Sequence, residues 1–318
     1  MKVLANDGIS KSGIDALQDA GIEIITTKVA QEQLANYVNE HQIDVVLVRS
    51  ATTVRKEVID ACPSLKIIGR GGVGMDNIDV TYAREKGLHV INTPASSSGS
   101  VAELVFAHLF TGVRFLHDAN RNMPLEGESK FNDLKKAYAK GSELRGKTLG
   151  IIGIGRIGKE VAKIAIGCGM KVIASDSFVD KEVINVDFFD GQSIAIEIKT
   201  QPLEEILKNS DFITLHVPAQ KQYVIGKDQI ALMKDGAAII NASRGGVIDE
   251  VALVEALDSG KLSFAGLDTF EEEPTPAIKV LMNPKISLTP HIGAATEEAQ
   301  DRIGTELAQQ IIQIAKSI

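Results

Sequence analysis

The chain has 318 residues, enough for two domains, and its 44% hydrophobic and 24% charged residues are typical of a globular protein. The net charge of −8, without a concentrated basic stripe, argues against nucleic acid as a partner. The N-terminus lacks the apolar core of a signal peptide, and no apolar run approaches the roughly 18 residues that span a bilayer, so we expect a cytoplasmic protein with no membrane partner.

Residues 1–97 alternate between short apolar runs and helix-like stretches. The apolar runs, each predicted as a strand, are Lys2–Ala5, Ile22–Thr26, Val45–Val48, Lys66–Ile68 and Leu88–Ile91. Helices are predicted between them at Ser10–Ala20, Gln31–Glu40 and Ile78–Lys86. Strands that alternate with helices favour a parallel sheet covered on both faces, so we predict one small doubly wound domain here.

A long helix is predicted next, from Ser100 to about His117. Ser100 and Glu103 have the spacing of a capping box at its start. The following segment, Asn120–Gly141, is rich in lysine, glutamate and asparagine, and we expect it to face solvent or a partner.

A second alternating series occupies the later part of the chain. Its predicted strands are Thr148–Ile152, Lys171–Ser175, Phe212–His216, Ala238–Asn241, Phe264–Leu267 and Ile286–Leu288. Ile184–Thr200 departs from the series, because apolar and polar residues alternate on both sides of Asp190-Gly191, a pattern that predicts an inserted β-hairpin. The last segment, Thr296–Ile318, is helical in pattern and is predicted to cross back to the first domain.

The cysteines and histidines offer no metal site. Cys62 and Cys168 are far apart in the sequence and are expected to be free thiols in a reducing compartment. No cysteine or histidine cluster has the spacing of zinc ligands, so no metal is expected.

Thr148–Gly158 carries the most informative motif of the chain. Gly153, Gly155 and Gly158 form G-x-G-x-x-G after a predicted strand and at the start of a helix. These glycines allow a tight turn, the approach of a pyrophosphate to the backbone and close packing of helix on strand, and the helix N-terminus favours phosphate. Asp176 ends the next strand, where a carboxylate accepts both ribose hydroxyls and repels a 2′-phosphate, which favours NAD over NADP.

This motif begins almost halfway along the chain, which predicts that one domain is inserted into another. We predict an α/β fold of two doubly wound parallel-sheet domains, a Rossmann NAD-binding domain inserted into a flavodoxin-like substrate domain. The substrate domain is assigned residues 1–97 and 289–318, and the NAD-binding domain residues 98–288. The arrangement predicts an interdomain cleft beside the cofactor, with the hairpin near the cofactor edge.

Three segments after later strands carry side chains suited to acid–base chemistry. Arg244 follows a strand, and its planar fork can hold a carboxylate and polarise a carbonyl. His291 follows another strand, and histidine exchanges protons near neutral pH; His216 is its nearest rival. A glutamate of the run 271–273 paired with His291 would hold its tautomer and stabilise its charged form, and the sequence alone does not choose among the three.

Together these features give the chain a close resemblance to the D-isomer-specific 2-hydroxyacid dehydrogenase family over essentially its whole length. The matching stretches are Val48–Ser50, Gly69–Asn77, Asn92–Pro94, Gly150–Gly158, Asn241–Gly246, Gly266–Phe270, Glu273-Pro274 and Pro290–Gly293. The resemblance implies NAD as cofactor, a catalytic arginine at Arg244, the glutamate before the proline, Glu273, and the acid/base histidine at His291. It also implies a homodimer around the NAD-binding domain, with the predicted helix 100–117 and the polar segment after it as candidate contacts.

The resemblance also assigns contacts to the cofactor and the substrate. The residues implied at NAD are Gly153, Gly155, Arg156, Ile157, Gly158, Asp176, His216, Val217, Ala242, Ser243, Asp268, Gly293 and Ala294. The residues implied at the substrate are Arg49, Ser50, Arg70, Gly72, Val73 and Gly74. Backbone N–H groups of the glycine turn would hold the substrate carboxylate, and the two arginines suit a phosphate. Val73 would contribute only its backbone.

Within the family, the chain most resembles the members that oxidise D-3-phosphoglycerate to 3-phosphohydroxypyruvate, the first step of serine biosynthesis. The expected partner is therefore a small anionic 2-hydroxy acid, and the paired arginines favour a phosphorylated one. The alternatives are a hydroxypyruvate or glyoxylate reductase, another D-2-hydroxyacid dehydrogenase, and an NAD(H)-sensing transcriptional corepressor that shares this architecture. Because the chain stops at Ile318, we expect it to lack the C-terminal serine-binding regulatory domain of some members.

Overall fold

A computed structural model describes residues 1–317, which form two compact units. Unit 1 comprises Met1–Ser100 and the chain from Ala294 onward, and unit 2 comprises Val101–Gly293, so that unit 2 is inserted into the sequence of unit 1. The predicted boundaries at residues 97 and 288 are corrected to 100 and 293. The second boundary moves because Thr289–Gly293 are bound within unit 2 by the carboxylate of Asp268.

Unit 1 is built on a five-stranded parallel sheet in the order β2-β1-β3-β4-β5. Its strands are β1 (Lys2–Ala5), β2 (Glu23–Ile25), β3 (Val45–Val48), β4 (Ile67–Arg70) and β5 (His89–Asn92). Strand β3 is buried along its whole length, as expected of a central parallel strand covered on both faces. The strand order is that of flavodoxin-like domains, which confirms the predicted fold of this part of the chain.

Helices cover both faces of this sheet. They are α1 (Lys11–Asp19), η1 (Gln31–Gln33), α2 (Leu34–Glu40), α3 (Lys56–Ala61), α4 (Val80–Glu85) and α12 (Glu297–Ala315). One core contains Leu34, Ile59 and Ala83 from α2, α3 and α4, and the other contains Leu17 and Leu307 from α1 and α12. The two cores take alternate residues of the strands, so they lie on opposite faces of the sheet.

The chain returns to unit 1 through α12. Thr296 caps this helix, because its hydroxyl accepts a hydrogen bond from the Ala299 N–H at 3.1 Å. The predicted C-terminal helix of the first domain is confirmed up to Ala315, and its predicted last residue, Ile318, lies outside the described residues.

Unit 2 contains a six-stranded sheet in the order β13-β12-β11-β10-β6-β7, in which all paired strands are parallel. Its strands are β6 (Thr148–Ile152), β7 (Lys171–Ser175), β10 (Phe212–Leu215), β11 (Ala237–Asn241), β12 (Leu262–Leu267) and β13 (Ile286–Leu288). Strand β7 lies next to β6 on one side and β10 on the other, so the chain reverses its direction across the sheet after β7. Open parallel sheets bind ligands at such a switch point, which here lies at β6. This confirms the predicted doubly wound, Rossmann-type sheet.

Helices also cover both faces of the second sheet. They are α5 (Ser98–Val113), α7 (Arg156–Gly167), α8 (Leu203–Asn209), α9 (Lys227–Leu232), α10 (Glu250–Ser259) and α11 (Ile278–Leu281). One core holds residues of α8, α9 and α10, among them Ile206, Ile230 and Leu253. The other holds residues of α5 and α7, among them Leu109 and Val161.

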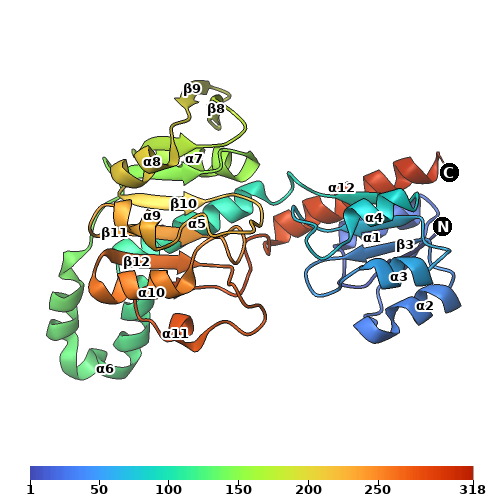
Figure 1. Cartoon of the computed structure of the whole chain (residues 1–318), viewed down its shortest axis with the longest axis horizontal. Coiled ribbons are helices and arrows are strands. Elements are labelled where there is room, and N and C mark those ends of the chain that lie inside the picture. Colours follow the sequence, from blue (N-terminus) through green and yellow to red (C-terminus); the bar gives the residue numbers. More distant parts are fainter. Residues whose placement is uncertain (318) are drawn as a thin grey trace. The chain divides into compact units, whose positions relative to one another are not determined.

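The segment after α5 differs from the prediction. Helix α5 begins at Ser98, so Ser100 lies inside the helix and does not cap it, and the helix ends at Val113 because Phe115 has a left-handed φ of 56°. The polar segment is itself helical, forming α6 (Leu116–Ala137) and η2 (Tyr138–Lys140). Figure 1 shows α6 reaching away from the sheet of unit 2.

The predicted hairpin is present as β8 (Lys181–Asp187) and β9 (Ser193–Lys199), an antiparallel pair. Asp190 and Gly191 form the turn, in which Gly191 has a φ of 86° and the Gln192 N–H donates to Asp190 Oδ1 at 3.1 Å. Ile184 and Ile198 are buried in the core that α5 and α7 share. The hairpin therefore replaces helical cover at the β7 end of the sheet.

The turn from β6 into α7 depends on glycine. A Cβ on Gly153, whose φ is 92°, would lie 2.5 Å from the carbonyl oxygen of His216. A Cβ on Gly158 would lie 2.2 Å from the carbonyl oxygen of Gly153, so α7 could not approach its strand. A Cβ on Gly155, the N-cap of α7, would meet nothing within 4 Å. Two glycines thus allow close packing, and the third leaves space open at the helix N-terminus.

Within residues 1–317, no single helix is long and apolar enough to span a membrane. Helix α5 and Leu116–Lys140 reach the necessary length and hydropathy only together, as a pair bent by 56°. Cys62 and Cys168 are both free. No group of three histidine, cysteine, aspartate or glutamate side chains in this part of the chain could hold a metal ion.

Gly158→Ala is expected to lower the free energy of unfolding by about 2 kcal/mol, because the new methyl group overlaps the Gly153 carbonyl. Gly167→Ala, in the same helix with nothing within 4 Å, serves as the control and should stabilise by up to about 1 kcal/mol. Urea unfolding followed by circular dichroism measures both, and equal stability of the two variants would contradict this account of the turn.

Burial lowers the pKa of His108, and the nearby charge of Asp268 raises this pKa by less. The His108 ring is held by two hydroxyl groups: Nδ1 lies 2.8 Å from Ser287 Oγ, and Nε2 lies 3.1 Å from Thr289 Oγ1. The folded state therefore favours neutral His108, and its contribution to stability is lost as pH falls below 6.5, where the unfolded chain takes up the proton. His108→Gln should lower the melting temperature at pH 7.5, and the gap to wild type should narrow at pH 5.5. A gap that widens on acidification would contradict this assignment.

Candidate active site

Unit 2 presents the predicted catalytic residues and nearly all predicted cofactor residues at one edge of its sheet. They are Gly153, Gly155, Arg156, Ile157 and Gly158 after β6, Asp176 after β7, His216 and Val217 after β10, Ala242, Ser243 and Arg244 after β11, Asp268 and Glu273 after β12, and His291 and Gly293 after β13. Because all six strands are parallel, these loops meet at the carboxyl edge of the sheet, where ligands bind in folds of this kind.

The β6–α7 turn fits the phosphates and ribose of a dinucleotide. The open space at Gly155 lies at the N-terminus of α7, where N–H groups and the helix dipole favour phosphate. Asp176 lies directly beside this turn, since its Oδ2 accepts from the Ile154 N–H and its Oδ1 from the Phe178 N–H, both at 2.9 Å. Its negative charge suits ribose hydroxyls and disfavours a 2′-phosphate.

His216 lies beside the glycine turn but is poorly suited to proton transfer. Burial lowers the pKa of His216 to about 3, which keeps the imidazole neutral near pH 7. Its Nε2 lies 3.1 Å from Thr214 Oγ1, and its buried Nδ1 has no hydrogen-bond partner in residues 1–317. Between the two rival histidines, the surroundings favour His291.

The loop after β11 fixes the backbone around Arg244. The Asn241 side chain bridges the loop: its Oδ1 accepts from the Ser243 N–H at 3.0 Å, and its Nδ2 donates to the Arg244 carbonyl at 2.8 Å. The guanidinium of Arg244 folds back, with Nη1 donating to the Ser243 carbonyl at 2.6 Å. The loop is therefore ordered by local hydrogen bonds that place a cation at the carboxyl edge.

His291 pairs with Glu273. Its Nδ1 lies 2.9 Å from Glu273 Oε2, and both side chains are more than a third exposed. The other carboxylate oxygen of Glu273, Oε1, accepts from the Phe270 N–H at 3.0 Å, which orients the carboxylate. Of the three adjacent glutamates, Glu273 is thus the one that contacts the imidazole. Bonding at Nδ1 leaves Nε2 as the ring nitrogen available for proton exchange.

Asp268 holds the turn that carries His291. Its carboxylate is buried, and it accepts from the Thr289 hydroxyl at 2.6 Å and from the N–H groups of Ile292 and Gly293, each at 2.8 Å. His291 has a φ of 55°, a left-handed conformation that costs an ordinary residue about 1–2 kcal/mol. The strained turn persists because Asp268 binds it on both sides of the histidine.

The predicted substrate residues belong to unit 1. Arg49 and Ser50 follow β3, Arg70 ends β4, and Gly72, Val73 and Gly74 follow β4, all at the carboxyl edge of the five-stranded sheet. Gly72 has a φ of 141°, and a Cβ there would lie 1.8 Å from Arg70 Nη1, so this glycine makes room for the guanidinium. Ala294, predicted at NAD, also belongs to unit 1, where its carbonyl accepts from Gln300 at 2.7 Å.

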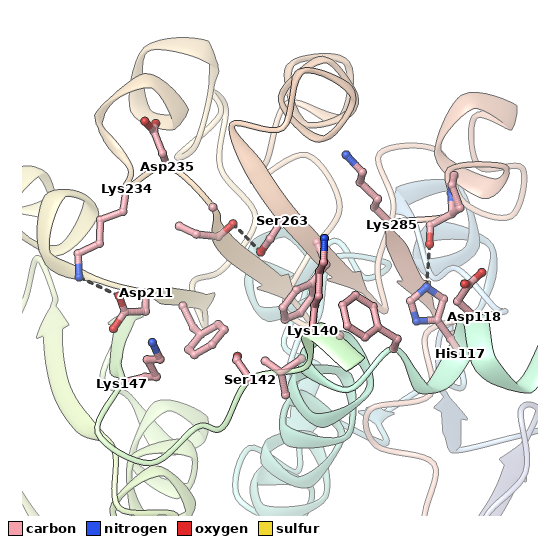
Figure 2. Close-up of a pocket in the computed structure, with 18 residues that line it drawn as sticks. His117, Asp118, Lys140, Ser142, Lys147, Asp211, Lys234, Asp235, Ser263 and Lys285 are labelled. Atoms are coloured by element: carbon pink, nitrogen blue, oxygen red, sulfur yellow. Dashed lines mark hydrogen bonds and ion pairs between the residues drawn. The ribbon is translucent and has the colours of Figure 1, made fainter. Parts of the chain in front are cut away.

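A separate cavity of about 510 Å³ lies at the amino ends of the unit 2 strands (Figure 2). Lys147 and Asp211, which line it, come directly before β6 and β10, and Asp211 is paired with Lys234 at 2.9 Å. This edge is opposite the one that carries Arg244 and His291. The cavity is therefore no part of the candidate active site.

Two residues that shape the site were not predicted. Asn241 orders the arginine loop, and Thr289 joins the Asp268 carboxylate to the histidine turn. Asn241 does carry a sequence signal, because an asparagine two residues before a serine at a strand end is typical of an Asx turn. Thr289 carries none, since its contact depends on how β12 and β13 lie in the sheet.

Comparison with known proteins identifies the arrangement. The model of the D-isomer specific 2-hydroxyacid dehydrogenase NAD binding domain matches residues 106–293, more than half of the chain. D-3-phosphoglycerate dehydrogenase of Methanocaldococcus jannaschii is 42% identical over 99% of this chain, and hydroxypyruvate reductase of Thermotoga maritima is 44% identical over 98%. The chain spans 58% of the length of the first relative and 97% of the second.

A solved structure extends the comparison to the cofactor. The NAD⁺-bound 3-phosphoglycerate dehydrogenase of Entamoeba histolytica superposes with a TM-score of 0.78 at 29% identity, covering 99% of this chain and 95% of that one. NAD is the cofactor that the glycine turn and Asp176 fit, in agreement with the matched NAD-binding model. The chain belongs to the D-isomer-specific 2-hydroxyacid dehydrogenase family.

Proposed function

We propose that this chain oxidises a D-2-hydroxy acid to the 2-oxo acid with NAD. The observation that carries the proposal is the 2.9 Å pair of His291 and Glu273 beside the Arg244 loop, at the sheet edge that also carries the glycine turn. The His291–Glu273 pair offers a proton acceptor. The Arg244 loop offers a cation that binds a carboxylate, and the glycine turn offers a site for the dinucleotide. Hydride transfer from a hydroxy acid requires these three groups.

His291 takes the proton in this reaction. With Nδ1–H donating to Glu273, the neutral ring presents the Nε2 lone pair, which removes the hydroxyl proton while the C2–H bond breaks and its electron pair leaves as hydride. NAD, when bound, supplies the hydride acceptor. The products are the 2-oxo acid, NADH and one proton, which His291 holds as an imidazolium stabilised by Glu273.

Arg244 orients the substrate and stabilises the oxygen that becomes a carbonyl. A guanidinium presents two parallel N–H groups to a carboxylate, and this fork also polarises a neighbouring C–O bond. The hydrogen bond from Nη1 to the Ser243 carbonyl restricts the side chain before substrate arrives. Less ordering entropy is then lost when the hydroxy acid binds.

For the substrate, we favour D-3-phosphoglycerate, which would give 3-phosphohydroxypyruvate as the first step of serine biosynthesis. Arg49 and Arg70 at the carboxyl edge of unit 1 supply the planar cations that suit a phosphate, and several relatives of the chain are named phosphoglycerate dehydrogenases. The second candidate, hydroxypyruvate reduction, is supported by the T. maritima relative, which the chain matches over 97% of its length.

We also infer a homodimer formed through α5 and α6 of the NAD-binding unit. Helix α6 exposes apolar side chains, with Leu125 81% and Phe131 55% accessible, and such groups favour burial against a partner. Sedimentation equilibrium should give twice the chain mass, and a monomer at micromolar concentration would contradict the inference.

NADH absorbance distinguishes the candidate substrates. Oxidation of D-3-phosphoglycerate, D-glycerate and D-lactate should rank phosphoglycerate first, with kcat/KM at least about tenfold above glycerate, because a phosphate gains charge-assisted hydrogen bonds from arginine. Reduction of hydroxypyruvate in preference to its phosphorylated form would favour the second candidate. No turnover of any hydroxy acid would contradict the proposed function.

His291→Ala should lower kcat by about a hundredfold to ten-thousandfold and leave the Kd of NADH within about twofold, because proton transfer is lost while the glycine turn is intact. His41→Ala provides a control, since this exposed histidine lies in unit 1, directly after α2, with Nδ1 3.0 Å from the Tyr37 carbonyl. Steady-state kinetics and NADH titration measure both variants. Wild-type turnover in His291→Ala would show that another group accepts the proton.

A further inference from the structure

The peptide units on either side of Phe270 connect the segments that carry all three predicted catalytic residues. On one side, the Phe270 N–H donates to Glu273 Oε1 at 3.0 Å, and Glu273 in turn pairs with His291. On the other side, the carbonyl of Phe270 would lie only 1.7 Å from a Cβ placed on Gly245, the residue after Arg244. The Phe270 N–H belongs to the preceding peptide unit, so a shift of the Phe270–Glu271 peptide would disturb the arginine loop directly and the Glu273 carboxylate through the Phe270 backbone.

Glu250 holds this peptide. The Glu271 N–H donates to Glu250 Oε1 at 2.8 Å, and the Glu250 N–H donates to Glu271 Oε1 at 2.9 Å, so the two residues bind each other's backbone reciprocally. Glu250 is the first residue of α10 and is only 7% exposed. The buried face of the helix packs in the core of unit 2, and the reciprocal bonds attach the loop after β12 to that helix.

The hydrogen bond from the Glu271 N–H needs an acceptor oxygen, which both the charged and the neutral form of Glu250 provide. Burial raises the pKa of the Glu250 carboxyl against the lowering effect of its bond to the Glu271 N–H, and the charges of Glu271 and Glu273 raise it further. The charged form is thus disfavoured, while the bond to the Glu271 N–H needs only an oxygen. Glutamine keeps that oxygen and removes the charge.

We propose that Glu250 is a positioning residue for hydride transfer, which fixes the Phe270–Glu271 peptide and thereby the geometry of Glu273, His291 and Arg244. The inference rests on the proposed function and extends it to a residue that touches neither substrate nor cofactor. Small displacements of catalytic groups reduce rates strongly, because the reacting atoms leave their productive geometry.

The variants separate the acceptor from the charge. Glu250→Ala removes the oxygen and should lower kcat about tenfold while leaving the Kd of NADH within about twofold. Glu250→Gln should restore kcat to within about twofold of wild type. Glu250→Asp, which keeps the charge but withdraws the oxygen by one methylene, should give an intermediate kcat and replaces the alanine variant if that one does not fold. Glu255→Ala is the matched control, because Glu255 lies in α10, exposed, 3.7 Å from Lys227.

A kinetic isotope effect distinguishes positioning from mere loss of folded enzyme. With the hydroxy acid deuterated at C2, the isotope effect on kcat should rise in Glu250→Ala, because hydride transfer becomes slower relative to product release. A smaller fraction of folded enzyme would lower the rate without changing the isotope effect. Unchanged kcat and isotope effect in Glu250→Ala would overturn the proposal, as would a loss in Glu250→Gln as large as that in Glu250→Ala.

Amide hydrogen exchange tests the positioning role of Glu250 independently of enzymatic activity. In Glu250→Ala, amide exchange should accelerate in residues 270–274 and remain unchanged at the start of α7, because only the first segment loses its acceptor. Absence of turnover in the wild type would reject the proposed function, and exchange would still decide whether Glu250 fixes the peptide. Unchanged exchange in residues 270–274 would reject the positioning role whatever the activity.

Discussion

Backbone N–H groups bound to carboxylate oxygens hold together the loops at the carboxyl edge of unit 2. Asp268 binds the turn of His291, and Glu273 and Glu250 bind successive N–H groups of the loop after β12. A hydrogen bond to a charged acceptor contributes about 1.5–3 kcal/mol, roughly twice the value of a neutral one, and the bond to Glu250, whose charged form burial disfavours, is of the weaker kind. The loops carry no regular structure of their own, so these bonds determine where the candidate catalytic side chains lie.

The same bonds connect the fold to its chemistry. Parallel strands bring distant segments to one edge, but an edge alone leaves each loop free to adopt several courses. The carboxylates select one course, in which His291 keeps a left-handed φ of 55° and its Nδ1 meets Glu273. Strain of this kind is stable only where neighbours impose it. The site is therefore ordered before substrate binds, which is what rapid hydride transfer requires.

Sequence patterns predicted the parts of this molecule that depend on local periodicity. Thr148–Ile152 is predicted to the residue, because an apolar run bounded by polar residues and a glycine turn has few alternatives. Helix α6 was not predicted, because Leu116–Ala137 is largely polar and contains Pro124. The pairing of His291 with a glutamate of the run 271–273 was predicted, but only the family resemblance chose Glu273, because the choice depends on the course of the loop after β12 in space. The reciprocal bonds of Glu250 depend on the same course and were not predicted.

We propose that His291, fixed by Glu273, accepts the proton of a D-2-hydroxy acid. A crystal structure of the dead-end complex with NADH and the preferred hydroxy acid tests this role most directly. In that complex the C2 hydroxyl oxygen should lie within about 3.2 Å of His291 Nε2, and Arg244 should bind the carboxylate. A hydroxyl bound to another group, with His291 Nε2 directed away from the substrate, would contradict it.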